Sequence, residues 1–273
     1  MSIQIMSDLH LEVANEYATF HITPMADHLG LLGDIGNVVK HKEQFFEFIT
    51  RQLLQFKAVL FVPGNHEAYH SNWEDTLATL NSFEMEERDE SMGKFILLHR
   101  ERFPIPGTNT IVLGCSLFSR VPSNMHITMG MRIHDFHAIE GWTTDMHNEE
   151  HWEDVSWLNR QIVDIPGFPE DDIIILTHWS PTRHRDTINP VHAMSPLSCA
   201  FATDLSLETC FVSDQVKIWA FGHSHYNCDV IVDKWTSNGT MRMVSNQRGF
   251  PEAQTTDFDI NKVVSVSGHL EEI

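Results

Sequence analysis

The sequence predicts an α/β fold in which parallel strands alternate with helices. Short apolar runs, such as residues 58–63 and Asp172–Thr177, are typical of strands that are buried on both faces. Between two such runs, the apolar residues Phe45, Phe48 and Ile49 recur at the spacing of one helix face. This alternation favours a largely parallel sheet that is covered by helices.

The expected elements follow from the same two patterns along the chain. Each expected strand is an apolar run that ends at polar or turn residues, and each expected helix has apolar residues at helical spacing. A Pro-Gly-Phe-Pro sequence at 166–169 indicates a turn. Strands are expected at 3–6, 29–32, 58–63, 95–98, 110–114, 172–177, 217–221, 229–232, 241–245 and 263–266, and helices over 41–55, 73–88 and 147–163.

Two segments, 115–147 and 186–210, show neither pattern clearly. The first mixes Met, His, Pro and Gly residues. Long ordered segments of this kind often cap binding sites, and packing against the side of the domain would explain them equally well. Because no internal repeat, linker or low-complexity stretch interrupts the sequence, we expect residues 1–273 to form a single domain.

Composition and charge narrow the range of partners. The formal net charge of −20 disfavours binding to nucleic acid or to anionic membranes. An anionic substrate would therefore need local positive charge, such as that of a bound metal ion. The chain begins directly in an expected strand, no apolar run has the length of a membrane span, and the four cysteines lack zinc-type pairing. These features predict a cytoplasmic protein with free thiols.

Polar residues that can bind metals follow five of the expected strands. Each group alone has an ordinary explanation as a turn or a helix cap, and the Asp-x-His spacing also occurs by chance at Asp135/His137 and Asp145/His147. Turns and caps do not, however, select His and Asp at five strand ends. The groups are Asp8 and His10, Asp34, Asn65 and His66, His178, and His223 and His225.

The donor types predict a site for two metal ions. Leaving His66 aside, they are two Asp, four His and one Asn, a mixture without thiolate that suits Mn, Fe or Zn. This set exceeds one tetrahedral site, and it suits two ions roughly 3.5–4 Å apart that share a carboxylate. A hydroxide that bridges the ions could attack an anionic phosphate, while His66 assists the leaving group. Glu67 could orient or charge His66.

The order of these blocks resembles the calcineurin-like metallophosphoesterase superfamily. The blocks are Asp8-x-His10, Gly33-Asp34, Gly64-Asn65-His66-Glu67, His178 and Gly222-His223-x-His225. The resemblance implies a four-layer α/β sandwich, with two central mixed sheets flanked by helices. It also implies that the first metal is held by Asp8, His10 and His225, the second by Asn65, His178 and His223, that Asp34 bridges them, and that His66 is the general acid or stabilises the transition state.

Departures from the sequence patterns of three subfamilies argue against the activities of those subfamilies. Residues 35–39 lack the Asp-Arg pair that follows Gly-Asp in Ser/Thr protein phosphatases. His66 stands where UDP-sugar pyrophosphatases of the lipid A pathway carry Arg. The double-strand-break nucleases are usually larger, and the charge of −20 disfavours one.

The sequence thus favours a phosphoesterase that acts on a small phosphate ester. We lean to a phosphodiesterase, because no dedicated cluster of basic residues is evident for a terminal dianion. The alternatives are a phosphomonoesterase, which includes a divergent Ser/Thr protein phosphatase, and a non-catalytic scaffold, which need not keep His66. Substrate identity, native metals and oligomeric state are left open. Substrate contact is likewise left open for Tyr69, His70, Arg120, Trp179, Arg183 and Arg248.

Overall fold

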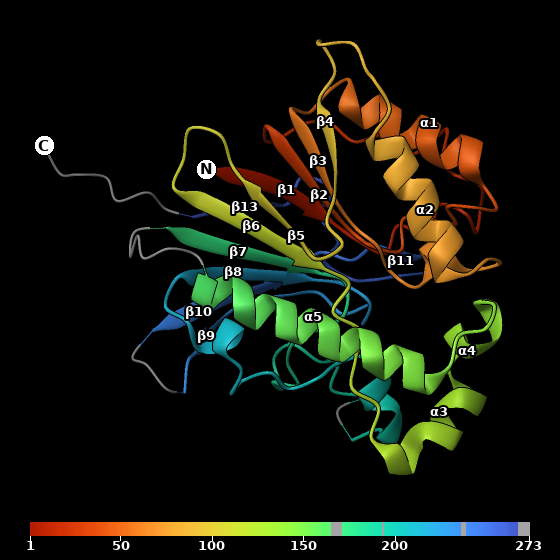
Figure 1. The fold of residues 1–273 in the computed structure, drawn as a ribbon, viewed down its shortest axis with the longest axis vertical. Helices are drawn as coiled ribbons and strands as arrows, with labels where there is room; N and C mark the ends of the chain where they lie inside the picture. The colour runs from red at the N-terminus through yellow and green to blue at the C-terminus, as the bar shows by residue number, and fades with distance from the viewer. Residues whose placement is uncertain (165–170, 193, 236–238, 267–273) are drawn as a thin grey trace, which may run out of the picture.

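Two β-sheets packed face to face form the centre of the computed structural model (Figure 1). The structure describes residues 1–164, 171–192, 194–235 and 239–266. The first sheet has the order β13-β1-β2-β3-β4, and the second has the order β5-β6-β7-β8-β10-β9. In both sheets the inner strands are parallel, while β13, β5 and β9 pair antiparallel at the edges.

All strands of the two large sheets except β5 match apolar runs of the sequence. The first sheet consists of β1 (Ser2–Met6), β2 (His28–Leu32), β3 (Ala58–Val62), β4 (Lys94–Leu97) and β13 (Val263–Ser265). The second consists of β5 (Glu101–Pro104), β6 (Thr110–Cys115), β7 (Asp172–Thr177), β8 (Val216–Phe221), β9 (Cys228–Asp233) and β10 (Thr240–Ser245). A separate short hairpin joins β11 (Gly249–Phe250) to β12 (Ala253–Gln254).

Helices cover the outer faces of both sheets, so the molecule has four layers (Figure 1). The helices α1 (Lys42–Leu53) and α2 (Trp73–Glu84) pack on the first sheet, and α5 (Thr144–Asp164) packs on the second. A third group of buried residues, including Ile5, Leu60 and Ile174, fills the space between the sheets. The central strands are therefore apolar on both sides, which explains their unbroken hydrophobic runs. The predicted sandwich of two mixed sheets flanked by helices is confirmed.

The differences from prediction lie in short or partly exposed elements. The helix expected over 147–163 begins earlier, at Thr144, and α2 ends at Glu84 rather than at 88. The edge strand β5 was missed because its residues are mostly exposed and lack a clear apolar pattern. The turn expected at 166–169 lies outside the described residues.

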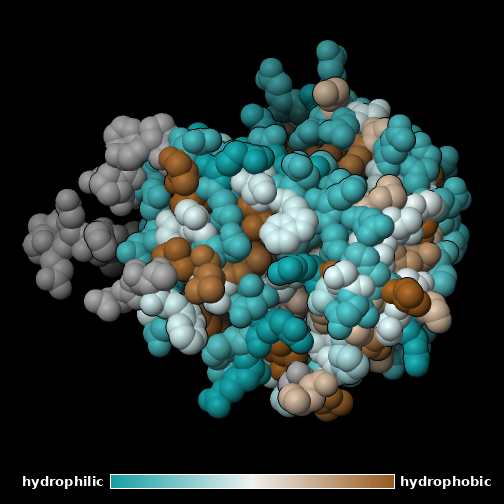
Figure 2. Space-filling view, turned by 60° about the horizontal axis from the view of Figure 1, so that its bottom comes forward, coloured by the Kyte–Doolittle hydropathy of each residue, from teal (hydrophilic) through white to brown (hydrophobic). Residues whose placement is uncertain are grey.

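The two irregular segments contain short helices. In 115–147 these are η2 (Ser123–Met125), α3 (His126–Arg132) and α4 (Asp135–Ala138), and in the second segment they are η3 (Pro196–Ala200) and the start of α6 (Thr209–Val212). A further short helix, η1 (His66–Ala68), follows β3. Within the described ranges, no helix is both long and apolar enough to cross a membrane. Among the coloured residues of Figure 2, hydrophobic side chains lie in small groups between hydrophilic ones.

Candidate metal centre

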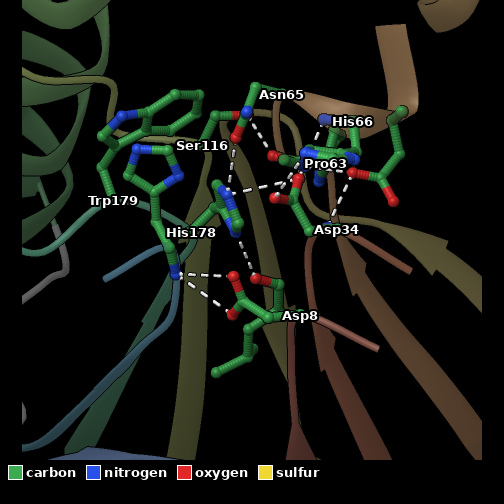
Figure 3. A network of polar contacts seen from close by, with 12 residues as sticks. Asp8, Asp34, Pro63, Asn65, His66, Ser116, His178 and Trp179 are labelled. Carbon is green, nitrogen blue, oxygen red and sulfur yellow. Dashed lines mark hydrogen bonds and ion pairs between the residues drawn. The ribbon is translucent and has the colours of Figure 1, made fainter. Parts of the chain in front are cut away.

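The carboxyl ends of strands from both sheets converge on one site. Asp8, Asp34 and Asn65 follow β1, β2 and β3 of the first sheet, and His178 and His223 follow β7 and β8 of the second. Figure 3 shows Asp8, Asp34 and Asn65 around His178, with His66 beside Asp34. All eight predicted site residues lie in this network, which includes His10 and His225.

The backbone at the site is strained in a regular way. Asp8, His10, Asp34, His223 and His225 all have positive φ angles, between 47° and 67°. This left-handed conformation is uncommon outside glycine and costs on the order of 1–3 kcal/mol per residue. Its repetition at the strand ends turns five side chains toward a common centre, and such strain concentrates at functional sites.

Asp8, His10 and His225 form the first candidate ligand group. The two Nε2 atoms of His10 and His225 lie 3.0 Å apart, and His225 Nε2 is 3.3 Å from Asp8 Oδ1. The Asp8 carboxylate also accepts the backbone N–H of His223 at 3.1 Å, which fixes its orientation. Three donor atoms thus face one small volume, an arrangement that suits a metal ion.

Asp34, His178 and His223 form the second candidate group, and Asn65 joins it. His178 Nδ1 lies 2.8 Å from the Leu32 carbonyl oxygen, and because a carbonyl can only accept, Nδ1 carries the hydrogen. His178 Nε2 therefore presents a lone pair, and it faces the Asn65 Oδ1 acceptor at 3.0 Å. Two acceptors at this distance repel each other unless a cation lies between them, so this group fits a metal ion.

The orientation of the Asn65 amide is held by residues of the segment 115–147. Asn65 Nδ2 donates to Asp135 Oδ1 at 2.9 Å and to the Tyr69 hydroxyl at 3.0 Å. Tyr69 in turn donates to Asp135 at 2.6 Å. These bonds leave Oδ1 as the atom that faces His178. The Asp135-x-His137 spacing was interpreted as chance, and neither residue belongs to a candidate ligand group. Asp135 nevertheless lies against the site on α4, where it holds the Asn65 amide.

Burial keeps His10, His178 and His223 neutral and their lone pairs available. Burial lowers the pKa of His10 to about 4 and that of His178 to about 4. It also lowers the pKa of His223 well below its ordinary value, and the neighbouring His178 lowers it further. Neutral imidazole is the form that binds metals.

The pKa values of the two buried aspartates, Asp8 and Asp34, shift in opposite directions. Burial, together with the nearby Glu67 and Asp8 carboxylates, raises the pKa of Asp34 well above its ordinary value. For Asp8, burial also raises the pKa, but the hydrogen bond and charge of His225 outweigh it and hold the pKa below the usual range. Buried carboxylates this close to one another call for cations.

His66 pairs with Glu12, not with Glu67. His66 Nδ1 lies 2.6 Å from Glu12 Oε1, and its ring stacks on Tyr69 at a centroid distance of 4.1 Å. Glu67 instead accepts the backbone N–H groups of Asp34 at 2.9 Å and Gly64 at 2.7 Å. The expectation that Glu67 orients His66 was therefore wrong. The alternation Asp8-x-His10-x-Glu12 is the signal that could have pointed to Glu12, because it places three polar residues on one side of the segment.

Gly64 is required by the close approach of two strand ends. A Cβ atom at this position would lie 2.4 Å from Asp34 Oδ1 and 2.8 Å from His178 Cε1. No real contact is that short, so a side chain here would displace two candidate ligands. The Gly-Asn-His sequence thus has a packing reason as well as a chemical one.

The candidate centre opens into a cavity of about 490 Å³, which we name the metal-side cavity. Its floor includes Asp34, Asn65 and His223. Its walls come from both irregular segments, with Arg132 and His134 from the first and Ile188, Leu197 and Phe201 from the second among them. These segments therefore cap the site, which was one of the two alternatives. Asp8 and His10 do not line this cavity and are fully buried.

Comparisons with known proteins agree with this geometry. The sequence model of the family described as calcineurin-like phosphoesterase matches residues 1–227. An uncharacterized protein of Acanthamoeba polyphaga mimivirus is 26% identical over 274 residues, and the match covers 91% of each chain.

A solved structure shows the same fold. The crystal structure of the phosphopantetheinyl hydrolase PptH from Mycobacterium tuberculosis superposes with a TM-score of 0.65 at 14% identity, and the match covers 92% of this chain and 90% of that one. The family match spans the strand-end residues described above, from Asp8 to His225. The chain therefore belongs to the calcineurin-like phosphoesterase family and is a metal-dependent phosphoric ester hydrolase.

Proposed function

We propose that the chain hydrolyses a small phosphate ester, with a preference for diesters, at a centre of two metal ions. The observation that carries this proposal is the pair of adjacent donor groups with His66 beside them. The proposed ligands are Asp8, His10 and His225 for one ion, Asn65, His178 and His223 for the other, and Asp34 for both.

Charge at the centre suits a phosphate. Asp8 and Asp34 contribute −2 and two divalent ions contribute +4, so the site would retain about +2 despite the chain's net charge of −20. Bound ions would supply this charge and lower the pKa of a water molecule that attacks phosphorus. Mn, Fe and Zn all suit the donor set.

His66 is placed to assist the leaving group. Its Nδ1 is engaged by Glu12 at 2.6 Å, so Nε2, which lies 3.9 Å from Asp34 Oδ2, is the nitrogen left for the substrate. In the proposed step, water first loses a proton to solvent, and the resulting hydroxide oxygen forms a bond to phosphorus as the bond between phosphorus and the leaving oxygen breaks. The Nε2 proton passes to the leaving oxygen, and Glu12 holds the ring in place throughout.

The metal-side cavity supports a substrate with an organic substituent. Ile188, Leu197 and Phe201 line it together with polar residues such as Asn189. A diester carries organic groups on both sides of phosphorus and would use this wall, whereas a monoester would not need it. The similar fold of a phosphopantetheinyl hydrolase makes phosphopantetheinyl esters a reasonable member of a substrate panel.

Both sheets contribute proposed ligands, so we propose that residues 1–273 act as one domain. The proposed partner is a small phosphate ester, with no role for nucleic acid or a membrane, and the proposed location is the cytoplasm. The charge of −20 supports the exclusion of nucleic acid.

The test compares bis(p-nitrophenyl) phosphate with p-nitrophenyl phosphate after loading with Mn, Fe or Zn. We expect faster hydrolysis of the diester. His66→Ala should lower kcat by roughly 10²–10⁴-fold while bound metal, measured by mass spectrometry, stays unchanged. His21→Ala, at an exposed position, is the control. Preference for the monoester would favour the phosphomonoesterase alternative, and inactivity on both esters with metal bound would favour a scaffold.

A further inference from the structure

A second cavity, of about 510 Å³, adjoins the metal-side cavity. The two share His66, Tyr69, His134 and Phe250 as lining residues. None of the seven proposed metal ligands lines the second cavity. A molecule bound at the metals could therefore extend past His66 into this second space.

Basic side chains from three separate segments line the second cavity, which we name the basic cavity. Lys40 and His41 precede α1, His70 follows η1, and His134 precedes α4. None of them forms an ion pair with a carboxylate among the residues that the structure describes. The positive charge of Lys40 is thus not neutralised by a carboxylate of the described residues, so it is available to an anionic ligand that enters the cavity.

Among the described lining residues of the basic cavity, Glu12 alone carries a carboxylate, and it is already engaged. Glu12 lines this cavity, but its Oε1 atom lies 2.6 Å from His66 Nδ1 and 3.6 Å from His10 Nδ1, and its side chain is only 8% exposed. The basic groups lie close enough to repel one another. Burial lowers the pKa values of His41 and His70, and the charge of Lys40 lowers both further. An anion among them would relieve this repulsion.

We propose that the basic cavity binds an anionic group of the leaving group, so that the substrate carries a second phosphate or a carboxylate on that side. This inference rests on the proposed function. His66 lines both cavities, and the oxygen that it protonates belongs to the leaving group. The atoms attached to that oxygen therefore extend into the basic cavity, while phosphorus lies on the metal side. After the phosphorus–oxygen bond breaks, the leaving group keeps its anionic charge beside Lys40.

The proposal gives Lys40 a role in specificity. Its ammonium can donate to an anion in the cavity, and the ring N–H groups of His41, His70 and His134 can add hydrogen bonds. A hydrogen bond from an ammonium to a carboxylate or phosphate is charge-assisted and stronger than one between neutral groups. Its loss should therefore reduce kcat/KM for a suitable anionic leaving group by roughly tenfold or more.

The test uses two methyl phosphodiesters whose leaving groups are 4-hydroxybenzoate and 4-hydroxybenzamide. The leaving groups have nearly the same shape and differ in one negative charge. The ratio of the two kcat/KM values is measured for the wild type, for Lys40→Gln and for the control Lys42→Gln. Lys42 is exposed, outside the cavity lining and two residues away, so both variants change net charge equally. Comparing ratios between variants cancels the intrinsic reactivity of the esters.

We expect Lys40→Gln to lower this ratio about tenfold and Lys42→Gln to leave it unchanged. Inhibition by free 4-hydroxybenzoate should weaken in parallel. Equal ratios in all three proteins, or an equal loss in both variants, would overturn the anionic subsite while the proposed hydrolysis stands. Failure of the metal-loaded wild type to hydrolyse either ester would overturn the proposed function and the subsite together.

Discussion

Replacement of Asp135 by alanine should weaken metal binding, although Asp135 is not itself a proposed ligand. Asp135 Oδ1 accepts hydrogen bonds from Asn65 Nδ2 at 2.9 Å and from the Tyr69 hydroxyl at 2.6 Å. A flipped amide would turn its oxygen toward this carboxylate and its NH₂ group toward the metal. The carboxylate therefore selects the amide orientation that suits a metal ligand.

The size of the effect follows from these bonds. Alanine removes the acceptor of two buried donors, and Asn65 Nδ2 keeps only the Tyr69 hydroxyl, at 3.0 Å. A buried donor that loses its partner costs about 1–3 kcal/mol. Since this is the free energy that favoured one amide orientation, we expect affinity at the second metal position to fall roughly 10–100-fold.

The assay is a metal titration against a competing chelator, with occupancy checked by mass spectrometry. Asp135→Ala should bind one ion normally and the other weakly. Asp135→Asn keeps an oxygen that can accept both bonds and should lie between the alanine variant and the wild type. Asp233→Ala, at an exposed position on β9, controls for the loss of one negative charge. Two unchanged affinities in Asp135→Ala would refute the reasoning.

Three further substitutions test separate parts of the molecule. Glu12→Gln removes the charge beside His66 and should lower kcat about tenfold with metal content unchanged; an unaltered kcat would contradict the pairing. In Gly222→Ala the Cβ atom would lie 2.6 Å from a carboxylate oxygen of the first ligand group, so metal content should fall, whereas Gly130→Ala, where nothing lies within 4 Å, should bind metal normally. Equal metal content in both would argue against this crowding. Burial lowers the pKa of His147 to about 3 from 6.5. Because the unfolded state binds the proton first, the stabilising contribution is complete above pH 6.5 and is lost as pH falls toward 3, by about 2 kcal/mol at pH 5. Denaturant unfolding measures the free energy of unfolding at pH 7 and at pH 5. The loss between the two pH values should be smaller for His147→Gln than for the wild type. An equal loss in the two proteins would contradict this role of His147.

The sequence by itself determined the sandwich's strands, apart from the exposed edge strand β5, and the residues at their ends. Strands such as β3 and β7 are buried on both faces, so their apolar runs are visible locally. Parallel strands bring their carboxyl ends to the same edge, so His178 and Asn65 could be expected together from position alone. The local sequence was sufficient to predict these site residues, because each group consists of a few neighbouring residues directly after one strand.

The tertiary structure alone decided which groups surround those residues. Glu67 adjoins His66 in the sequence, but the turn after β3 directs its carboxylate to the backbone amides of Asp34 and Gly64. The imidazole instead meets Glu12, which lies 54 residues away in the chain. Asp135 meets Asn65 across 70 residues. The basic cavity likewise joins Lys40 to His134, which no local pattern could reveal. Such contacts depend on how segments that are distant in the sequence pack against each other, and the local pattern of residues does not encode that packing.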